Sequence, residues 1–253
     1  MKGLITAAAA AAVLLAGCGG GGGGDGDGKA SASTPVTTPT AAGEYNGVTS
    51  DNRVVDTIVL DTGAVYVQYG AVGQPNVYGG FVVGTTQSSA GALSGGSGID
   101  YNLLGQGTNA VTVTGTYSAK QSLDAAVTYG NGTKITTHQT YQTNFDQTPS
   151  LPSIAGTYRG TMLLSQGGDA STFTIDSAGK VTGSATSGCT FTGTVAPHAQ
   201  GNVFDMSVQF GTTACAYPGQ TATGIVMLWS STVVHAMLQT PSKVGVALIA
   251  KQS

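Results

Sequence analysis

Histidine is the residue type best suited to hold a metal ion or to act as a general acid or base near neutral pH. The chain has three, His138, His198 and His235. No two of them lie at a metal-ligand spacing, and neither an HExxH motif nor a CxxC pair is present. We expect each to be a surface or packed histidine, and the sequence predicts neither a metal site nor a cofactor.

Hydrolytic chemistry would need an activated serine or a pair of carboxylates. The chain has no Gly-x-Ser-x-Gly nucleophile elbow, although a triad can also assemble from distant residues. Paired carboxylates would have to come from eleven aspartates and one glutamate, Glu44. Asp61 and Asp176 are expected to open hairpins, and Asp124 and Asp205 to face solvent. The acidic residues therefore favour structural roles, and we expect no enzyme.

Tyrosines are concentrated in the first half of the chain, at positions 66, 69, 78 and 101. Aromatic side chains can line a ligand cleft, but they are also ordinary cross-strand neighbours in sheets. The second interpretation is favoured here, and the first stays open.

The composition excludes some partners and favours one fold class. Charged residues make up 8% of the chain and the net charge is −3, whereas nucleic-acid binding needs clustered lysine and arginine. Glycine is abundant, at 40 of 253 residues. Strong helix formers other than alanine are scarce, while valine, threonine and tyrosine are common. These features predict β structure and no nucleic-acid partner.

The first seventeen residues have the features of an export signal. A short positive start precedes an apolar run of about fourteen residues, too short to span a membrane. Residues 15–18, Leu-Ala-Gly-Cys, resemble the bacterial lipobox. The resemblance implies cleavage before Cys18, lipid on its thiol and acylation of the new amine. The alternative is a buried N-terminal helix with a chance cysteine, which the following glycine run disfavours.

The position after Cys18 is Gly19, where a retention signal for the inner membrane would have aspartate. The resemblance therefore implies a bacterial envelope protein held at the outer membrane by its lipid. Which side of that membrane it faces stays open.

Short segments of alternating polarity, separated by turn residues, continue to the C-terminus. In the segment 203–210, Phe204, Met206, Val208 and Phe210 share one face. About eight such segments follow residue 154, and short connections favour pairing between neighbours. The sequence thus predicts an all-β chain with two tandem antiparallel meander barrels or sandwiches.

Four regions are predicted. They are a signal peptide (1–17), a lipidated cysteine with a flexible tether (18–43), a first β domain (44–148) and a second β domain (154–253). Pro149 and Pro152 separate the two halves. A weak repeat relates residues 43–47, GEYNG, to 156–160, GTYRG. The alternative is one continuous sandwich whose repeat reflects only the abundance of threonine and glycine.

Two cysteines remain after Cys18, namely Cys189 and Cys215. An exported protein can form disulfides, and a metal pair would lack nearby histidines. We predict a disulfide that closes a loop of 26 residues. On the chain-entropy model such a crosslink stabilises the fold by roughly 3.5 kcal/mol.

Several motifs resemble a family of uncharacterised proteobacterial lipoproteins with β-rich domains. They are residues 60–63 (LDTG), 187–193 (SGCTFTG) and 218–224 (PGQTATG). The resemblance implies the compartment and no activity. We expect a noncatalytic binding or interaction module whose ligand is a small molecule or a protein. The alternatives are a passive envelope component and, third, a hydrolase acting on envelope polymers.

Overall fold

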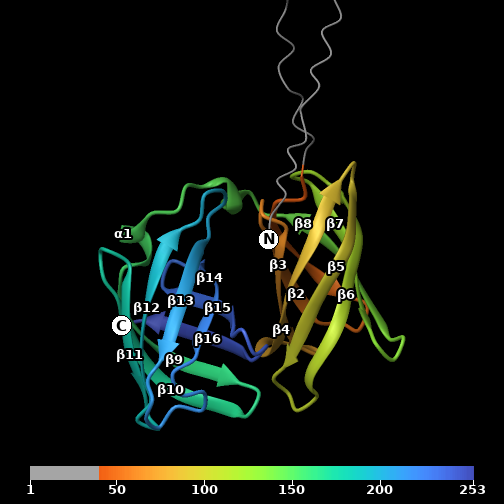
Figure 1. The fold of residues 1–253 in the computed structure, drawn as a ribbon. Coiled ribbons are helices and arrows are strands. Elements are labelled where there is room, and N and C mark those ends of the chain that lie inside the picture. The colour runs from red at the N-terminus through yellow and green to blue at the C-terminus, as the bar shows by residue number, and fades with distance from the viewer. Residues whose placement is uncertain (1–39) are drawn as a thin grey trace, which may run out of the picture. The chain divides into compact units, whose positions relative to one another are not determined.

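The computed structural model describes residues 40–253 (Figure 1). The predicted signal peptide, Cys18 and nearly all of the tether lie outside the described residues, so their assignments stay predictions. Among the described residues, no helix is long and apolar enough to cross a membrane.

The first half of the described chain is a closed antiparallel barrel of eight strands. The strands are β1 (Gly43–Thr49), β2 (Val54–Val59), β3 (Ala64–Ala71), β4 (Gln74–Ser89), β5 (Ala92–Asn102), β6 (Gly107–Ser118), β7 (Ser122–Tyr129) and β8 (Lys134–Tyr141). Each strand pairs with the next, and β8 returns to β1, with Tyr45 opposite Tyr141. Closure leaves no free sheet edge.

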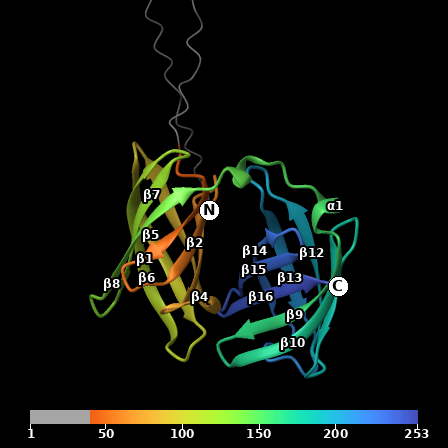
Figure 2. The same ribbon diagram turned by 180° about the vertical axis from the view of Figure 1, so that it is seen from behind.

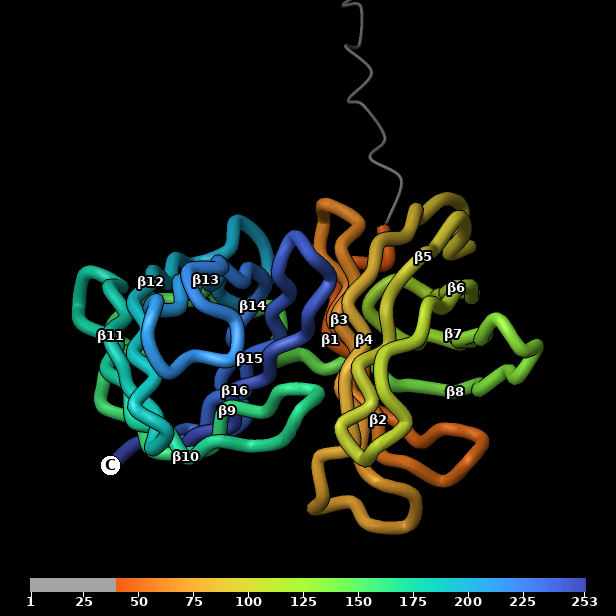
Figure 3. Tube along the Cα trace, turned by 60° about the horizontal axis from the view of Figure 1, so that its bottom comes forward, coloured from red at the N-terminus to blue at the C-terminus, as the bar shows by residue number. Residues whose placement is uncertain are grey.

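The second half repeats this topology. Its strands are β9 (Gly156–Leu164), β10 (Gly167–Ile175), β11 (Lys180–Ala185), β12 (Thr190–Pro197), β13 (Phe204–Phe210), β14 (Thr221–Ser230), β15 (Val233–Gln239) and β16 (Gly245–Gln252). β16 pairs with β9 and closes the ring. The chain follows each barrel in sequence order, as the colour gradient shows (Figures 2 and 3).

The predicted fold class is confirmed, and both units are barrels. A continuous sandwich is wrong, because each half closes its own ring of hydrogen bonds. The segment between β8 and β9 holds two short helices, η1 (Thr143–Asp146) and α1 (Leu151–Ile154). Pro152 lies in the first turn of α1, where its missing N–H group costs no helical hydrogen bond.

The interior of the second barrel is filled by large side chains. Phe204, Met206, Val208 and Phe210 are all buried, as their alternation predicts, whereas Asp205 is exposed. Phe173, Phe191 and Tyr158 complete the aromatic part of this core. Cys189 and Cys215 form a disulfide next to the same cluster.

The weak sequence repeat corresponds to one structural position in the two barrels. Tyr45 on β1 donates a hydrogen bond from its hydroxyl to the carbonyl of Ala41 at 3.0 Å. Tyr158 on β9 donates in the same way to the carbonyl of Ile154 at 2.8 Å. In each barrel, the buried tyrosine of the first strand therefore fixes the chain that enters the barrel.

Candidate functional site: the open interior of the first barrel

The first barrel encloses a cavity of about 360 Å³. Valine is the commonest lining residue, at seven of 25 positions, whereas the core of the second barrel carries phenylalanine and methionine. The apolar lining comprises Val55, Val59, Val65, Val67, Val82, Leu93, Val113, Leu123, Val127 and Ile135. An eight-stranded barrel has an interior just wide enough to be filled by side chains or to hold one small ligand. The side chains lining the first barrel are smaller than those in the second, so its interior has room for one small ligand.

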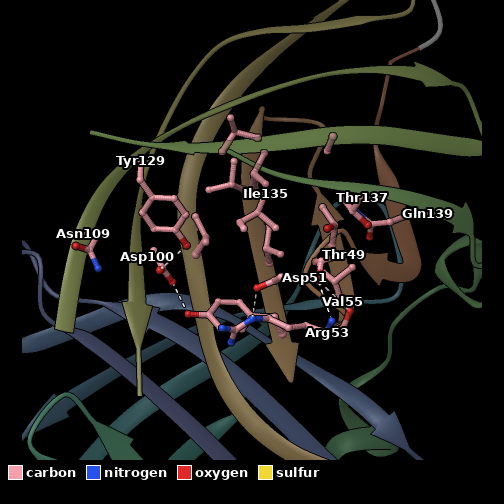
Figure 4. Close-up of a pocket in the computed structure, with 18 of the residues that line it drawn as sticks. Thr49, Asp51, Arg53, Val55, Asp100, Asn109, Tyr129, Ile135, Thr137 and Gln139 are labelled. Atoms are coloured by element: carbon pink, nitrogen blue, oxygen red, sulfur yellow. Dashed lines mark hydrogen bonds and ion pairs between the residues drawn. The ribbon is translucent and has the colours of Figure 1, made fainter. Parts of the chain in front are cut away.

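The cavity opens where the β1–β2, β5–β6 and β7–β8 hairpins turn, and this end is polar. Arg53, in the first of these turns, pairs through Nε with Asp51 Oδ2 at 2.7 Å. Its guanidinium also lies over the ring of Tyr69, 5.3 Å from the centroid. Figure 4 shows Asp51 beside Arg53 at this mouth. The ion pair and the stacking hold one cation at the entrance in a defined place.

A buried carboxylate joins two strands near the mouth. Asp100 on β5 is only 2% exposed. Its carboxylate accepts hydrogen bonds from the hydroxyls of Tyr69 on β3, at 2.6 Å, and Tyr129 on β7, at 2.9 Å. Burial raises the pKa of Asp100, and the two tyrosine hydrogen bonds and the charge of Arg53 oppose this shift. The three side chains therefore form a polar rim that links β3, β5 and β7, and Figure 4 labels Asp100 and Tyr129 of this rim.

The opposite end of the barrel is closed by aromatic rings. Tyr45 and Tyr141 meet edge to face, with ring centroids 5.5 Å apart. Both are buried. The cavity is therefore open at one end only, with a polar mouth and an apolar wall.

One polar side chain interrupts the wall near the closed end. Gln139 on β8 is 1% exposed and lines the cavity. Neither its amide nitrogen nor its amide oxygen has a hydrogen-bond partner in the described part of the chain. Buried amides are nearly always paired, so this residue distinguishes the cavity from an ordinary core.

The histidines considered from the sequence are not part of this cavity. His138 is exposed and pairs with Asp124 at 2.7 Å. His198 lies between two aspartates, with Nε2 at 3.0 Å from Asp61 and Nδ1 at 2.9 Å from Asp205. Residues 40–253 contain no cluster of three or more histidine, cysteine or acidic side chains that could hold a metal ion.

His235 belongs to a second, buried polar network. Its Nδ1 donates to Gln68 Oε1 at 2.8 Å, and Gln68 Nε2 donates to Asp56 Oδ2 at 2.8 Å. The His235 ring also stacks on the indole of Trp229, with an interplanar angle of 2°. Burial lowers the pKa of His235 to about 4. The imidazole is therefore neutral at physiological pH and serves packing.

Of the four tyrosines noted in the sequence, only Tyr69 lines the cavity. The residues that sequence analysis did not select are Arg53, Asp100, Tyr129 and Gln139. A signal for one of them existed. Gln139 has the same parity along its strand as Ile135 and Tyr141, so it falls on an inward position. Asp100 alternates with Ile99 and Tyr101, so its sequence pattern instead predicts the polar face of the strand.

No protein-family model matches the chain, and no curated protein matches its sequence. Among solved structures, it is similar to the isotype 1 transferrin binding protein B from serogroup B Neisseria meningitidis, with a TM-score of 0.31 and 11% identity. The similarity covers 80% of this chain and 66% of that chain. The resemblance to proteobacterial lipoproteins stays a prediction.

Proposed function

We propose that this chain is a noncatalytic binding protein that holds a small, largely apolar molecule inside its first barrel. The observation that carries the proposal is the contrast between the two interiors. The barrels share strand number and topology, yet one is filled by aromatic side chains and the other has a cavity of about 360 Å³. Ligand sites have volumes of about 300–1,000 Å³.

The lining supports an apolar body with polar ends. Ten of the 25 lining side chains are valine, leucine or isoleucine, so an apolar molecule would leave water on entering. The charged groups that line the cavity, Asp51, Arg53 and Asp100, all lie toward the mouth. A ligand's hydrated or charged trailing end would therefore lie beside Arg53 while its body fills the barrel.

The test is a titration with N-phenyl-1-naphthylamine, a neutral apolar dye whose emission rises away from water. The wild-type protein should bind about one dye per chain. Val127→Phe adds a ring to the cavity wall and should abolish this site. Val48→Phe makes the same change on an exposed position of β1, where Val48 is 52% exposed, and should bind as wild type does.

Equal dye binding by wild type, Val127→Phe and Val48→Phe would show that the dye binds elsewhere, and would contradict the proposal. Absence of dye binding to the wild type would favour the passive envelope component instead.

We also propose, from the sequence, that lipid on Cys18 anchors this binding module in the envelope. Two or three acyl chains hold a protein stably at a membrane. Cys18→Ser should leave the precursor uncleaved and release the protein from the membrane fraction. Normal processing and membrane association of this variant would contradict the anchor.

A further inference from the structure

The feature that the proposed function leaves unexplained is the unpaired amide of Gln139. Along β8, positions 135, 137 and 139 line the cavity in order from the mouth toward the closed end. Figure 4 shows these three side chains along one strand, with Gln139 across the view from Tyr129 and Asn109. Gln139 therefore lies deep in the barrel, one inward position before the Tyr141 ring.

Packing alone does not require an amide at this place. Gln139 pairs with Gly47 on β1 and with Leu123 on β7. Gly47 presents no side chain, and Leu123 is fully buried and apolar. A leucine of similar size would fill the same space without burying two unpaired polar atoms, which costs free energy. The amide thus lowers stability in the empty barrel unless something in the cavity pairs with it.

The neighbouring polar groups do not satisfy the amide. Thr137, the next inward residue on β8, donates its hydroxyl to the carbonyl of Val48 at 3.1 Å. The Asp51–Arg53 pair and Asp100 lie at the other end of the cavity. The cavity lining has no charged residue beside Gln139, so a charged ligand group would be buried there without a counter-charge.

We infer that Gln139 is a specificity-determining residue, and that it selects a ligand whose leading end is uncharged and both donates and accepts a hydrogen bond. An alcohol or a carboxamide at the end of an aliphatic chain has this chemistry, because its donor meets the glutamine oxygen and its acceptor meets the glutamine nitrogen. The inference rests on the proposed function and names the ligand class for that cavity.

Dimensions support an aliphatic chain of moderate length. Gln139 lies six positions after Thr133 at the mouth, which is about 20 Å along the strand. With a strand tilt of about 40°, the depth along the barrel axis is about 15 Å. An extended chain of about ten carbons spans most of this distance.

The experiment measures displacement of the naphthylamine dye by 1-decanol, 1-fluorodecane and decanoate. The alcohol and the fluoroalkane have similar size, but only the alcohol donates a hydrogen bond. The wild type should prefer 1-decanol over 1-fluorodecane by about three- to tenfold. Gln139→Leu should remove this preference and raise the melting temperature of the empty protein, because the unpaired amide is gone.

The matched control is Thr140→Val, at an exposed position of the same strand outside the cavity lining, which should keep the preference. Gln139→Met is a second replacement that should behave as Gln139→Leu does, should the leucine variant fail to fold.

The experiment distinguishes failure of the proposed binding function from failure of the proposed role of Gln139. If the dye does not bind the wild type, the proposed function fails. If all ligands displace the dye but wild type and Gln139→Leu show the same preference, the cavity binds ligands and the role of Gln139 is wrong. Tighter binding of decanoate than of 1-decanol that is lost in Gln139→Leu would overturn the uncharged leading group.

Discussion

The hydroxyl of Tyr69 donates a hydrogen bond of 2.6 Å to the carboxylate of Asp100, and this contact joins β3 to β5 at the mouth of the first barrel. Tyr129 donates to the other oxygen of the same carboxylate at 2.9 Å. Burial raises the pKa of Asp100, and the two hydroxyl donors favour its charged form against this shift. The rim of the proposed binding site thus depends on the ionisation of one aspartate.

Removal of either hydroxyl should destabilise the protein near neutral pH. Tyr69→Phe is expected to lower the free energy of unfolding by about 1.5–3 kcal/mol at pH 7, because it removes a hydrogen bond to a charged, buried group. The loss should shrink in acid, where Asp100 is protonated. Urea unfolding at several pH values measures both effects.

Tyr66→Phe is the control for this experiment. Tyr66 lies on the same strand, β3, whereas the hydroxyls that donate to Asp100 are those of Tyr69 and Tyr129. Its replacement should change stability by less than about 0.5 kcal/mol. Equal losses in Tyr66→Phe and Tyr69→Phe would show that Asp100 is not responsible.

Asp56 should make the protein less stable as pH rises. Burial and, to a smaller extent, the charge of Glu44 raise the pKa of Asp56 to about 8. The hydrogen bond from Gln68 acts in the opposite direction and lowers this pKa. The unfolded chain titrates at about 3.9. Between these values the folded state binds more protons, so this aspartate's contribution to stability falls as pH rises through the window from about 4 to about 8.

Asp56→Asn is the variant that isolates this contribution. As pH rises through the window, the free energy of unfolding of Asp56→Asn should increase relative to that of the wild type by up to about 1.4 kcal/mol for each pH unit. Asn46, whose amide nitrogen donates to Asp56 Oδ1 at 2.7 Å, can turn its oxygen toward the new amide and keep the pairing. Parallel stability curves for the two proteins between pH 4 and 8 would contradict the raised pKa.

The chain's one tryptophan should report the ionisation of its neighbour. Trp229 stacks on His235, with ring centroids 4.9 Å apart, and a protonated imidazole quenches indole fluorescence. Because burial lowers the pKa of His235 to about 4, quenching should have its midpoint near that pH and not near 6.5, the ordinary histidine value. His235→Gln should remove the transition, whereas His138→Gln, at an exposed site, should leave it unchanged. A midpoint near 6.5 in the wild type would show that His235 is accessible to water.

The crosslink in the second barrel should contribute substantially to stability. The disulfide between Cys189 and Cys215 closes a loop of 26 residues. Reduction should lower the free energy of unfolding by roughly 3.5 kcal/mol, measured by urea unfolding with and without dithiothreitol. A double variant, Cys189→Ala with Cys215→Ala, should be insensitive to the reductant. Thiol counting that finds both cysteines free in the isolated protein would reject the crosslink.

Strand positions and their faces could be predicted from the sequence. Alternation along 203–210 placed Phe204 and Met206 inward and Asp205 outward, and the structure has them there. A period of two is a local property, because successive side chains of a strand point to opposite faces. The second half also contained the number of segments that a closed meander needs.

The sequence alone therefore determined the β content, the tandem arrangement and the pairing of neighbouring strands. The hollow of the first barrel was decided only in three dimensions, because it depends on the summed volume of side chains that eight strands bring to one interior. The same holds for Gln139. Its inward position follows from parity, but its lack of a partner arises because β1 supplies Gly47 and β7 supplies Leu123 beside it. Those neighbours are set by the register of a closed ring, which no local pattern encodes.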